Sequence, residues 1–358
     1  MKFQRFLILI FLSTFSALGQ QIPQFSQYYA NKFLYNPAFA GFEDFAEIKT
    51  GYRSQWQGIG NTNSTFYLNG NMPLGKTDYT SDGPTPTISS SKSYSYKKTY
   101  TRSKEHRTGT HKGIGFQLMA DNWGPIQSLS FAATYAFHLP MGGENKISGG
   151  FSLGSYYRTI SLAYKEFDVS QPNDPLLNSL GKLSASQNLF NMGLTYYNRS
   201  SHIGLAIWQP IMGSFNFSEK SNVDSTNQTV KTQAGKDSIF WVPVTKNSLG
   251  QMATVFIIQA GTRWDLSEDI KIYPSAILKF TSLKHLTAEG TLRAMLKEKI
   301  WTGLSYRYKE AIGFHLGALI SPKTTINYSY DIHTGIGPFS TAYSSSEVTL
   351  GYMFYWKK

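Results

Sequence analysis

Side chains along most of this chain alternate with a period of two between apolar residues and polar or small ones. In the segment LSFAATYAFHL at 129–139, apolar residues occupy the odd positions, and Ser, Ala, Thr, Ala and His occupy the even ones. Successive side chains of a β-strand point to opposite faces, so this segment would have one apolar face and one polar or small face. The same alternation at 147–157 and 286–296 predicts an all-β fold.

Fourteen segments of this kind follow one another, each about 9 to 13 residues long. Soluble strands are typically about 5–6 residues long, whereas a tilted strand needs about 9–11 residues to cross a bilayer. The lengths therefore predict a transmembrane antiparallel β-barrel of about 14 strands. The segments are centred near Thr50, Leu68, Leu118, Thr134, Leu153, Gly193, Leu205, Ile258, Ala276, Leu292, Leu304, Leu316, Tyr328 and Gly351.

Composition favours a barrel over a soluble β-sandwich, in which the apolar faces would form an internal core. Charged residues make up only 16% of the chain and aromatic residues 15%, against about 25% charged residues in ordinary soluble proteins. Tyr and Trp combine an apolar body with a polar tip, so they settle at the membrane–water interface. Aromatic residues expected there, at segment ends, are Trp56, Tyr156, Tyr157, Tyr196, Tyr197, Trp208, Trp264, Trp301, Tyr306, Tyr308 and those at 352–356.

The N-terminus has the pattern of a secretory signal peptide, residues 1–19. Lys2 and Arg5 precede a short apolar run, and Ala17 and Gly19 supply small residues before the cleavage point. The alternative is an N-terminal anchor, for which the apolar run is too short. The chain has no cysteine, which excludes disulfides, thiolate metal sites and a lipid-modified cysteine. The prediction is an exported protein of the bacterial outer membrane.

The chain is basic. Its net charge is +12, and removal of Lys2 and Arg5 leaves 32 basic against 22 acidic residues, a net charge of +10. This charge favours an anionic surface such as lipopolysaccharide as a partner. Nucleic acid is not expected as a partner of an exported chain.

No motif with a catalytic or metal-binding mechanism is present, so we expect neither an enzyme nor a cofactor. The seven histidines are scattered, and none has ligand spacing to another histidine together with a carboxylate. His138 and His315 could each meet a serine across neighbouring strands, which keeps an outer-membrane hydrolase such as a lipase as an alternative.

The opening stretch QFSQYYANKFLYNPAFAG, residues 24–41, is rich in amides and aromatic rings and contains one charge, Lys32. It would lie in the periplasm or fold into a polar barrel mouth, where each amide can find hydrogen-bond partners. Charges on polar strand faces indicate either a salt-bridged, water-filled or plugged interior or a channel lining. The first is favoured because the charges form no rings; they are Glu289, Arg293, Lys297 and Arg307.

An even number of strands places both chain ends on the periplasmic side. Hairpins near 161–188, 210–250 and 332–345 would then be long outward loops. A basic insert at 77–112 would lie in the periplasm, or outside the cell if the strand count is wrong by one. The insert is either a flexible solvated segment or an electrostatic dock for an acidic partner, with Lys97, Lys98, Arg102, Lys104 and Arg107 as the docking residues.

Both ends of the chain resemble the PorP/SprF family of outer-membrane proteins. PQFSQYYANKFLYNPAFAG followed by YRSQW is similar to the family's N-terminal signature, and INYSYDIHTGIGPFSTAYSSSEVTLGYMF at 326–354 is similar to its C-terminal region. The chain between them matches only in pattern and strand number, and the insert at 77–112 departs from the compact family pattern. The matching positions are Gln24, Phe25, Ser26, Gln27, Tyr28, Asn36, Pro37, Gly41, Tyr52, Arg53, Gln55 and Trp56, with Tyr328, Tyr330, Asp331, Gly335 and Gly337 near the end.

The resemblance implies a β-barrel of the type IX secretion system of Bacteroidetes. Such a barrel docks, exports or retains a secreted surface protein, such as a gliding adhesin, through the C-terminal sorting domain of that cargo. Other type IX secretion components would be partners, and no catalytic role is implied for the matching residues. The chain would then comprise a signal peptide at 1–19, a periplasmic or plug segment at 20–44 and a barrel at 45–358.

Two candidate sites follow. The N-terminal group of matching residues would form a plug and latch, with Arg53 pairing with Asp331 where the barrel closes its first strand onto its last.

Cargo would contact the outward loop at 210–250, unless that loop folds over its own barrel mouth. A channel or transporter for small solutes is the alternative function. Candidate contact residues of the loop are Phe215, Phe217, Phe240 and Trp241.

Overall fold

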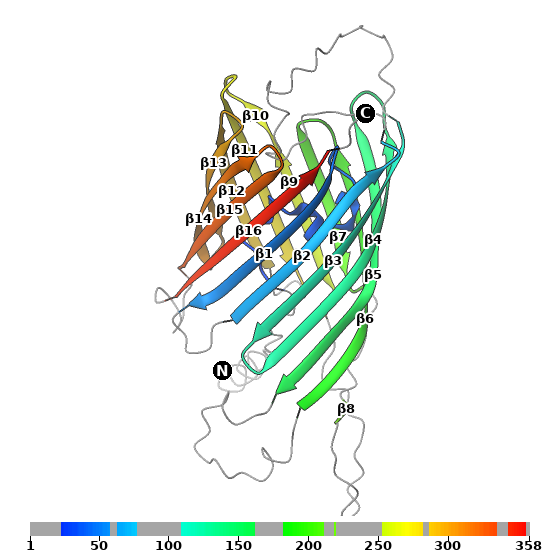
Figure 1. Cartoon of the computed structure of the whole chain (residues 1–358), viewed down its shortest axis with the longest axis vertical. Helices are drawn as coiled ribbons and strands as arrows, with labels where there is room; N and C mark the ends of the chain where they lie inside the picture. Colours follow the sequence, from blue (N-terminus) through cyan, green and yellow to red (C-terminus); the bar gives the residue numbers. More distant parts are fainter. Residues whose placement is uncertain are drawn as a thin grey trace, which may run out of the picture.

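The computed structural model describes residues 23–57, 63–76, 109–161, 182–210, 218–219, 253–281, 286–334 and 343–355. Fourteen long antiparallel strands form one closed barrel, in which strands adjacent in sequence are paired (Figure 1). Every predicted segment centre falls within one of them, so the predicted fold is confirmed. The strands are β1 Ala46–Gln57, β2 Asn63–Leu74, β3 His111–Trp123, β4 Ile126–Pro140, β5 Lys146–Ser161, β6 Lys182–Tyr197, β7 Ser201–Trp208, β9 Val255–Thr262, β11 Ile270–Phe280, β12 Leu286–Leu296, β13 Ile300–Arg307, β14 Ala311–Ser321, β15 Thr324–His333 and β16 Ser344–Phe354.

Two further strands have only two residues each. β8, Ser218–Glu219, pairs with β6, and β10, Trp264–Asp265, pairs with β11. The long strands span 8 to 16 residues, a wider range than the predicted 9 to 13. The longest are β4 to β6, and β6 extends past β7 at the lower end of the barrel in Figure 1, because their alternating pattern continues beyond the length that a bilayer requires.

The barrel closes where β1 pairs with β16. The register runs from Ala46 opposite Phe354 to Ser54 opposite Ser346, so the predicted closure of the first long strand onto the last is confirmed. A closed sheet satisfies backbone N–H and C=O groups within the protein, which the hydrocarbon interior of a membrane demands.

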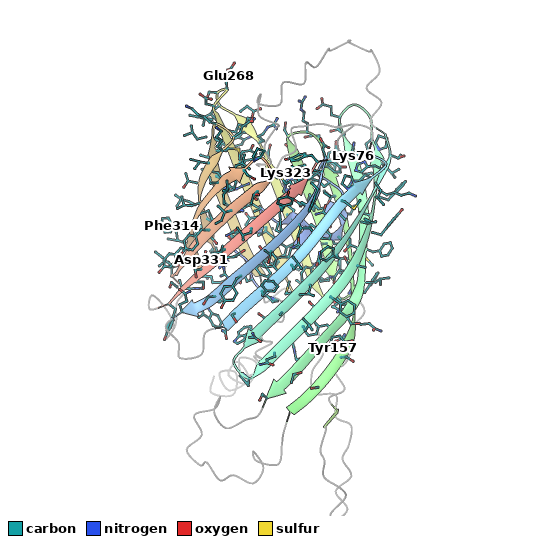
Figure 2. All side chains as sticks on the ribbon, in the orientation of Figure 1. Lys76, Tyr157, Glu268, Phe314, Lys323 and Asp331 are labelled. Atoms are coloured by element: carbon teal, nitrogen blue, oxygen red, sulfur yellow. The ribbon has the colours of Figure 1, made fainter. Side chains whose placement is uncertain are left out.

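Apolar side chains face outward and polar or small ones face inward. Leu153 is 54% exposed, whereas its neighbour Ser152 is 1% exposed. Phe314 and Tyr157 likewise lie on the outer surface (Figure 2). A soluble sandwich would have buried the apolar face, so the outward arrangement excludes that alternative.

Four of the aromatic residues expected at the membrane interface instead lie inside the barrel. Tyr156, Tyr197 and Trp301 are buried, and the Trp208 indole donates a hydrogen bond to the carbonyl of Tyr35 in the interior. The reason is strand parity: Tyr157 and Tyr196 are the exposed members of their adjacent pairs. Position at a strand end does not by itself decide which face a ring occupies.

The N-terminal segment, residues 23–45, folds inside the barrel as two short 3-10 helices, η1 Lys32–Leu34 and η2 Pro37–Phe39, shown in dark blue in Figure 1. Proline suits the first position of η2 because a helix start leaves the N–H unpaired. The Asn36 side chain caps this helix by accepting a hydrogen bond from the Ala38 N–H at 2.9 Å. No helix among the described residues is long and apolar enough to cross a membrane.

Candidate functional site: the filled lumen

The N-terminal segment, called here the lumenal segment (residues 23–45), contacts the barrel wall around its circumference. Hydrogen bonds join it to strands on every side of the lumen. These bonds link Ala30 to Lys49 on β1, Gly41 to Asn71 on β2, Phe33 to Gln117 on β3, Ala40 to His138 on β4, Ala38 to Ser148 on β5, Asn36 to Thr195 on β6, Tyr35 to Trp208 on β7, Tyr28 to Ser275 on β11, and Ser26 to Arg307, Asp331 and Glu347 on β13, β15 and β16.

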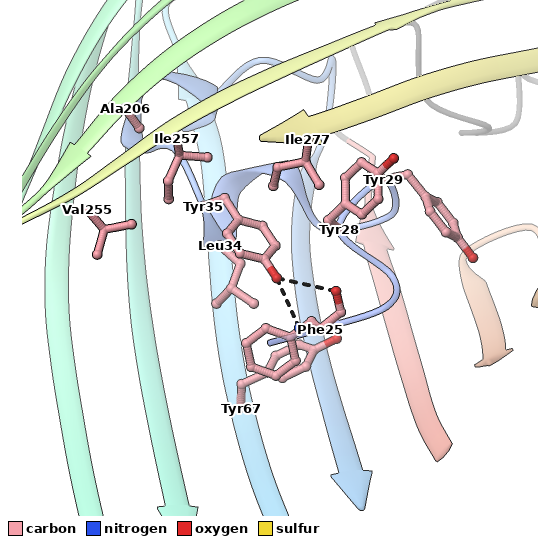
Figure 3. Packing of buried hydrophobic residues seen from close by; sticks show 10 residues of the cluster. All are labelled: Phe25, Tyr28, Tyr29, Leu34, Tyr35, Tyr67, Ala206, Val255, Ile257 and Ile277. Atoms are coloured by element: carbon pink, nitrogen blue, oxygen red, sulfur yellow. Dashed lines mark hydrogen bonds between the residues drawn. The ribbon is translucent and has the colours of Figure 1, made fainter. Parts of the chain in front are cut away.

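Apolar packing adds to these bonds. Figure 3 shows five residues of the lumenal segment, with Phe25 and Tyr35 folded back against each other, packed on Tyr67, Ala206, Val255, Ile257 and Ile277 of the wall. The Phe25 N–H donates to the Tyr35 hydroxyl at 3.1 Å, which fixes the fold-back. Each fully buried large apolar side chain stabilises such an arrangement by about 1.5–3 kcal/mol, so this segment is packed like a protein core.

Two glycines in the wall allow the segment to approach closely. A β-carbon on Gly113 would lie 1.8 Å from the carbonyl oxygen of Ala40, and one on Gly150 would lie 2.6 Å from the carbonyl carbon of Pro37. Both obstacles are backbone atoms, which cannot move aside as a flexible side chain can. Glycine at these wall positions is therefore required for the lumenal segment to lie where it does.

A buried charged cluster, called here the latch (Ser26, Arg53, Asp331 and Glu347), fixes the start of the segment. The Arg53 guanidinium contacts Asp331 at 3.0 Å and Glu347 at 3.3 Å. The Ser26 N–H donates to Glu347 at 2.7 Å, and the Ser26 hydroxyl donates to Asp331 while accepting from Arg53. The predicted pair of Arg53 with Asp331 is therefore confirmed, and Ser26 joins it to the lumenal segment.

A second arginine extends this charge network. Arg307 contacts Glu289 at 2.9 Å, Asp331 at 3.5 Å and Glu310 at 3.6 Å. The Gln24 amide fits between them when its oxygen accepts from the Arg307 Nε at 2.7 Å and its nitrogen donates to Glu310 at 3.2 Å. The predicted salt-bridged interior is present at this wall.

The remaining positions that match the family signature lie inside the lumen, at the end of β1 and on the outer face of the barrel. Gln27 donates to the Glu347 carbonyl at 3.0 Å inside the lumen. Gln55 and Trp56 lie at the end of β1, where the Trp56 ring packs edge-on against Trp123. Tyr52, Tyr328 and Tyr330 are exposed on the outer face, away from the lumenal segment.

Several predicted sites lie outside the described residues. These are the signal peptide at 1–19, Gly335 and Gly337, the loop residues Phe215, Phe217, Phe240 and Trp241, and the insert residues Lys97, Lys98, Arg102, Lys104 and Arg107.

One residue of the site was predicted wrongly, and one was not predicted at all. Lys297 was expected on the polar face of β12, but it lies beyond the strand, in the turn to β13, with a positive φ of 50°. Strand alternation does not say where a strand ends. Glu347 was not singled out, although its position on the polar face of the terminal EVTLGY strand was a signal that could have identified it.

In the candidate serine–histidine pair on β4 and β5, the hydrogen bonds of both side chains indicate a structural role rather than a catalytic one. The His138 Nε2–H donates to the Ala40 carbonyl at 2.8 Å, and Nδ1 therefore accepts from the Tyr197 hydroxyl at 2.7 Å. The Ser148 hydroxyl donates to the Ala38 carbonyl at 2.7 Å. Both side chains hold the lumenal segment, and Nε2 carries the proton that a base facing Ser148 would have to lack. Within the described part of the chain, no cluster of three or more metal-ligating side chains occurs.

The closed sheet, the outward apolar face and the filled interior define a transmembrane β-barrel protein of the bacterial outer membrane. A family model described as type IX secretion system membrane protein PorP/SprF matches residues 17–352. The chain belongs to this family, and membership implies other secretion components as partners. No curated protein matches the sequence.

Several solved structures are similar to this chain at very low sequence identity. A Pseudomonas aeruginosa FadL homologue is 10% identical, with 94% of this chain and 96% of that chain covered and a TM-score of 0.47. The Ralstonia pickettii toluene transporter TbuX is 9% identical, with coverage of 90% and 93% and a TM-score of 0.44. Acinetobacter baumannii Omp33 is 7% identical, with coverage of 87% and 99% and a TM-score of 0.42.

Proposed function

We propose that this protein is a non-enzymatic component of the type IX secretion system that docks, exports or retains a secreted surface protein, such as a gliding adhesin, through the C-terminal sorting domain of that cargo. The observation that supports this proposal is the filled lumen. Its own N-terminal segment occupies the described interior and is bonded to strands around the circumference. A barrel filled in this way suits recognition of a protein better than passage of solutes.

In this proposal residues 1–19 direct export and are removed, residues 20–44 form the plug, and 45–358 form the barrel. The even number of long strands puts both ends of the barrel domain on one side, which we assign to the periplasm. Lipopolysaccharide would contact the outer surface, and the basic insert at 77–112 would meet an acidic periplasmic partner.

The cargo contact is assigned to the outward loop at 210–250. The strands that flank it in the sequence are β7, which ends at Trp208, and β9, which begins at Val255. Loops carried by a rigid scaffold are where binding functions collect. Aromatic side chains commonly dominate the binding energy of a protein interface, so Phe240 and Trp241 are the residues to test.

The test is affinity purification of the tagged protein from detergent-solubilised outer membrane, followed by mass spectrometry. Wild-type protein should retain a large secreted protein together with type IX components. A Phe240→Ser/Trp241→Ser variant should lose the secreted protein but keep its heat-modifiable electrophoretic mobility, which reports an assembled barrel.

A control variant, Lys97→Gln/Lys98→Gln, changes the basic insert, which we assign to the periplasmic side, and should still retain the cargo. Normal retention by the aromatic variant would remove this loop from the proposal. A lone barrel recovered from wild-type membranes would argue against docking itself.

A further inference from the structure

A small cavity lies between the lumenal segment and the wall formed by β7, β9, β11 and β12. Its volume is about 10 Å³, which is room for one particle about the size of a water molecule. Its lining combines aromatic rings with polar and charged groups and includes Tyr28, Tyr29, Lys32, His202, Gln259 and Arg293.

Two cations of this lining form no direct ion pair with a carboxylate. Arg293 is 2% exposed and lies 3.8 Å above the Tyr29 ring centroid, and its Nε and Nη1 atoms have no hydrogen-bond partner. The Lys32 ammonium is also buried, has no hydrogen-bond partner and lies 5.1 Å from the Phe42 ring centroid. Among the described residues no acid forms an ion pair with either one, in contrast to Arg53 and Arg307.

Glu43 is the acid whose charge acts most strongly on Lys32, although no hydrogen bond joins the two. Two other nearby carboxylates are engaged elsewhere: Glu47 is bonded to Lys49 at 2.7 Å, and Glu289 is bonded to Arg307 at 2.9 Å. A buried charge without a counter-charge is costly, by several kcal/mol in typical proteins. Arg293 has no carboxylate counter-charge and Lys32 has only the indirect one of Glu43, so a negative group inside the cavity would stabilise both cations.

Neutral hydrogen-bonding groups also converge on the cavity. Gln259 is 3% exposed, and neither atom of its amide has a hydrogen-bond partner. The Nδ1 atom of buried His202 is likewise without a partner. An amide N–H and a ring N–H are the donors that a small anion accepts from.

We propose that this cavity binds one small monovalent anion of chloride size, held between Lys32 and Arg293 and completed by hydrogen bonds from Gln259 and His202. Because Lys32 belongs to the lumenal segment and Arg293 to β12, the anion would tie that segment to the wall. This inference concerns the barrel interior and is independent of the cargo assignment.

The direct test uses bromide, which replaces chloride and scatters X-rays anomalously. Crystals of the full-length protein in detergent, grown in bromide, should show an anomalous peak in the cavity within contact distance of the Lys32 ammonium and the Arg293 guanidinium. A cavity that contains only water, without an anomalous peak, would overturn the proposal. A peak that persists in Arg293→Gln would reveal an adventitious ion only.

A second measurement does not require crystals. The thermal midpoint of the purified wild-type protein should rise in chloride relative to gluconate at equal ionic strength, because gluconate is too large for the cavity. Above the dissociation constant the rise should be about 2 °C or more for each tenfold increase in chloride.

The chloride effect should vanish in Arg293→Gln and persist in Arg199→Gln, a matched charge change at an exposed arginine. Equal midpoints of the wild-type protein in chloride and gluconate would contradict the proposal even if the Arg293 variant failed to fold.

Discussion

At the scale of single residues, buried ion pairs decide whether the segment is held. Arg53 is the only charged partner of Glu347 among the described residues, whereas Asp331 also contacts Arg307. Removal of one member of a buried pair costs about 3–5 kcal/mol, because the other charge remains desolvated and uncompensated. The latch should therefore respond unequally to loss of its cation and loss of its anion.

We predict that Arg53→Met lowers the free energy of unfolding by about 3–5 kcal/mol, and that Arg53→Met/Glu347→Gln recovers part of this loss. Urea unfolding of the refolded barrel in detergent, followed by tryptophan fluorescence, measures both variants and the single variant Glu347→Gln. The difference between the double variant and the sum of the single ones gives the coupling energy. Strict additivity would mean that Arg53 and Glu347 do not act as a pair.

Lys32 should make stability depend on pH. It lies in the lumenal segment rather than in a membrane-spanning strand, and burial lowers its pKa from the ordinary 10.5 to about 7, although nearby Glu43 opposes this shift. Between pH 7 and 10.5 the unfolded chain keeps the proton that the folded protein has released, so stability rises with pH. Below pH 7 both states are protonated, and the full cost of burying the charge remains.

In halide-free buffer the wild-type protein should therefore gain about 2 kcal/mol between pH 7 and 9. Lys32→Met should be more stable than wild type at pH 7 and should lose most of this pH dependence. Urea unfolding midpoints at the two pH values provide the measurement. A wild-type midpoint that does not change would show that Lys32 is protonated in the folded state throughout this range.

The roles of some residues follow from strand parity and charge, which can be predicted from a sequence, whereas others depend on three-dimensional packing, which cannot. Arg53 and Asp331 stood out as opposite charges on polar faces. Ser26 could not be assigned to them, because nothing in a sequence tells where a non-repetitive segment lies within a lumen. Trp301 was placed at the membrane interface, but it faces inward and bonds Asn327.

At the scale of elements, the lumenal segment depends on wall positions that lack a side chain. A β-carbon on Gly150 would meet the Pro37 backbone, whereas one on the adjacent Gly149 would meet nothing within 4 Å. The two residues are neighbours on the same strand with opposite faces, so they form a matched pair. Any general effect of a larger residue on β5 should be shared by both.

We predict that Gly150→Val releases part of the lumenal segment and that Gly149→Val does not. Hydrogen–deuterium exchange of peptides from residues 24–41 should become faster by at least tenfold in Gly150→Val, which corresponds to about 1.4 kcal/mol of lost protection. Exchange in the strands should change little. Equal protection in the two variants would show that the segment can shift to accept the added side chain.

Element existence was predictable from period-two alternation, because fourteen strands repeat one simple rule. Their ends were not, as β4 to β6 show by running to 15 or 16 residues. The two short helices of the lumenal segment carry no periodic signal in the sequence. Their position is set by packing against a wall that is built from the rest of the chain.

At the scale of the whole molecule, the closed wall and the filled interior act together. The wall supplies inward polar groups at regular intervals, and the lumenal segment supplies amides, hydroxyls and rings that satisfy many of them. Opening a path would require loss of these bonds and exposure of a packed aromatic cluster. The barrel should therefore remain closed to solutes while its segment is seated.

We predict that the wild-type protein gives no stable conductance in planar lipid bilayers, and that deletion of residues 24–41 produces a steady ohmic current. The deletion leaves all strands intact, and heat-modifiable mobility would confirm that the barrel assembles. Arg53→Met, which weakens only one end of the segment, should give brief openings rather than a steady current. A steady wild-type conductance equal to that of the deletion variant would mean that the segment does not occlude the lumen, and it would favour a channel for small solutes over a docking barrel.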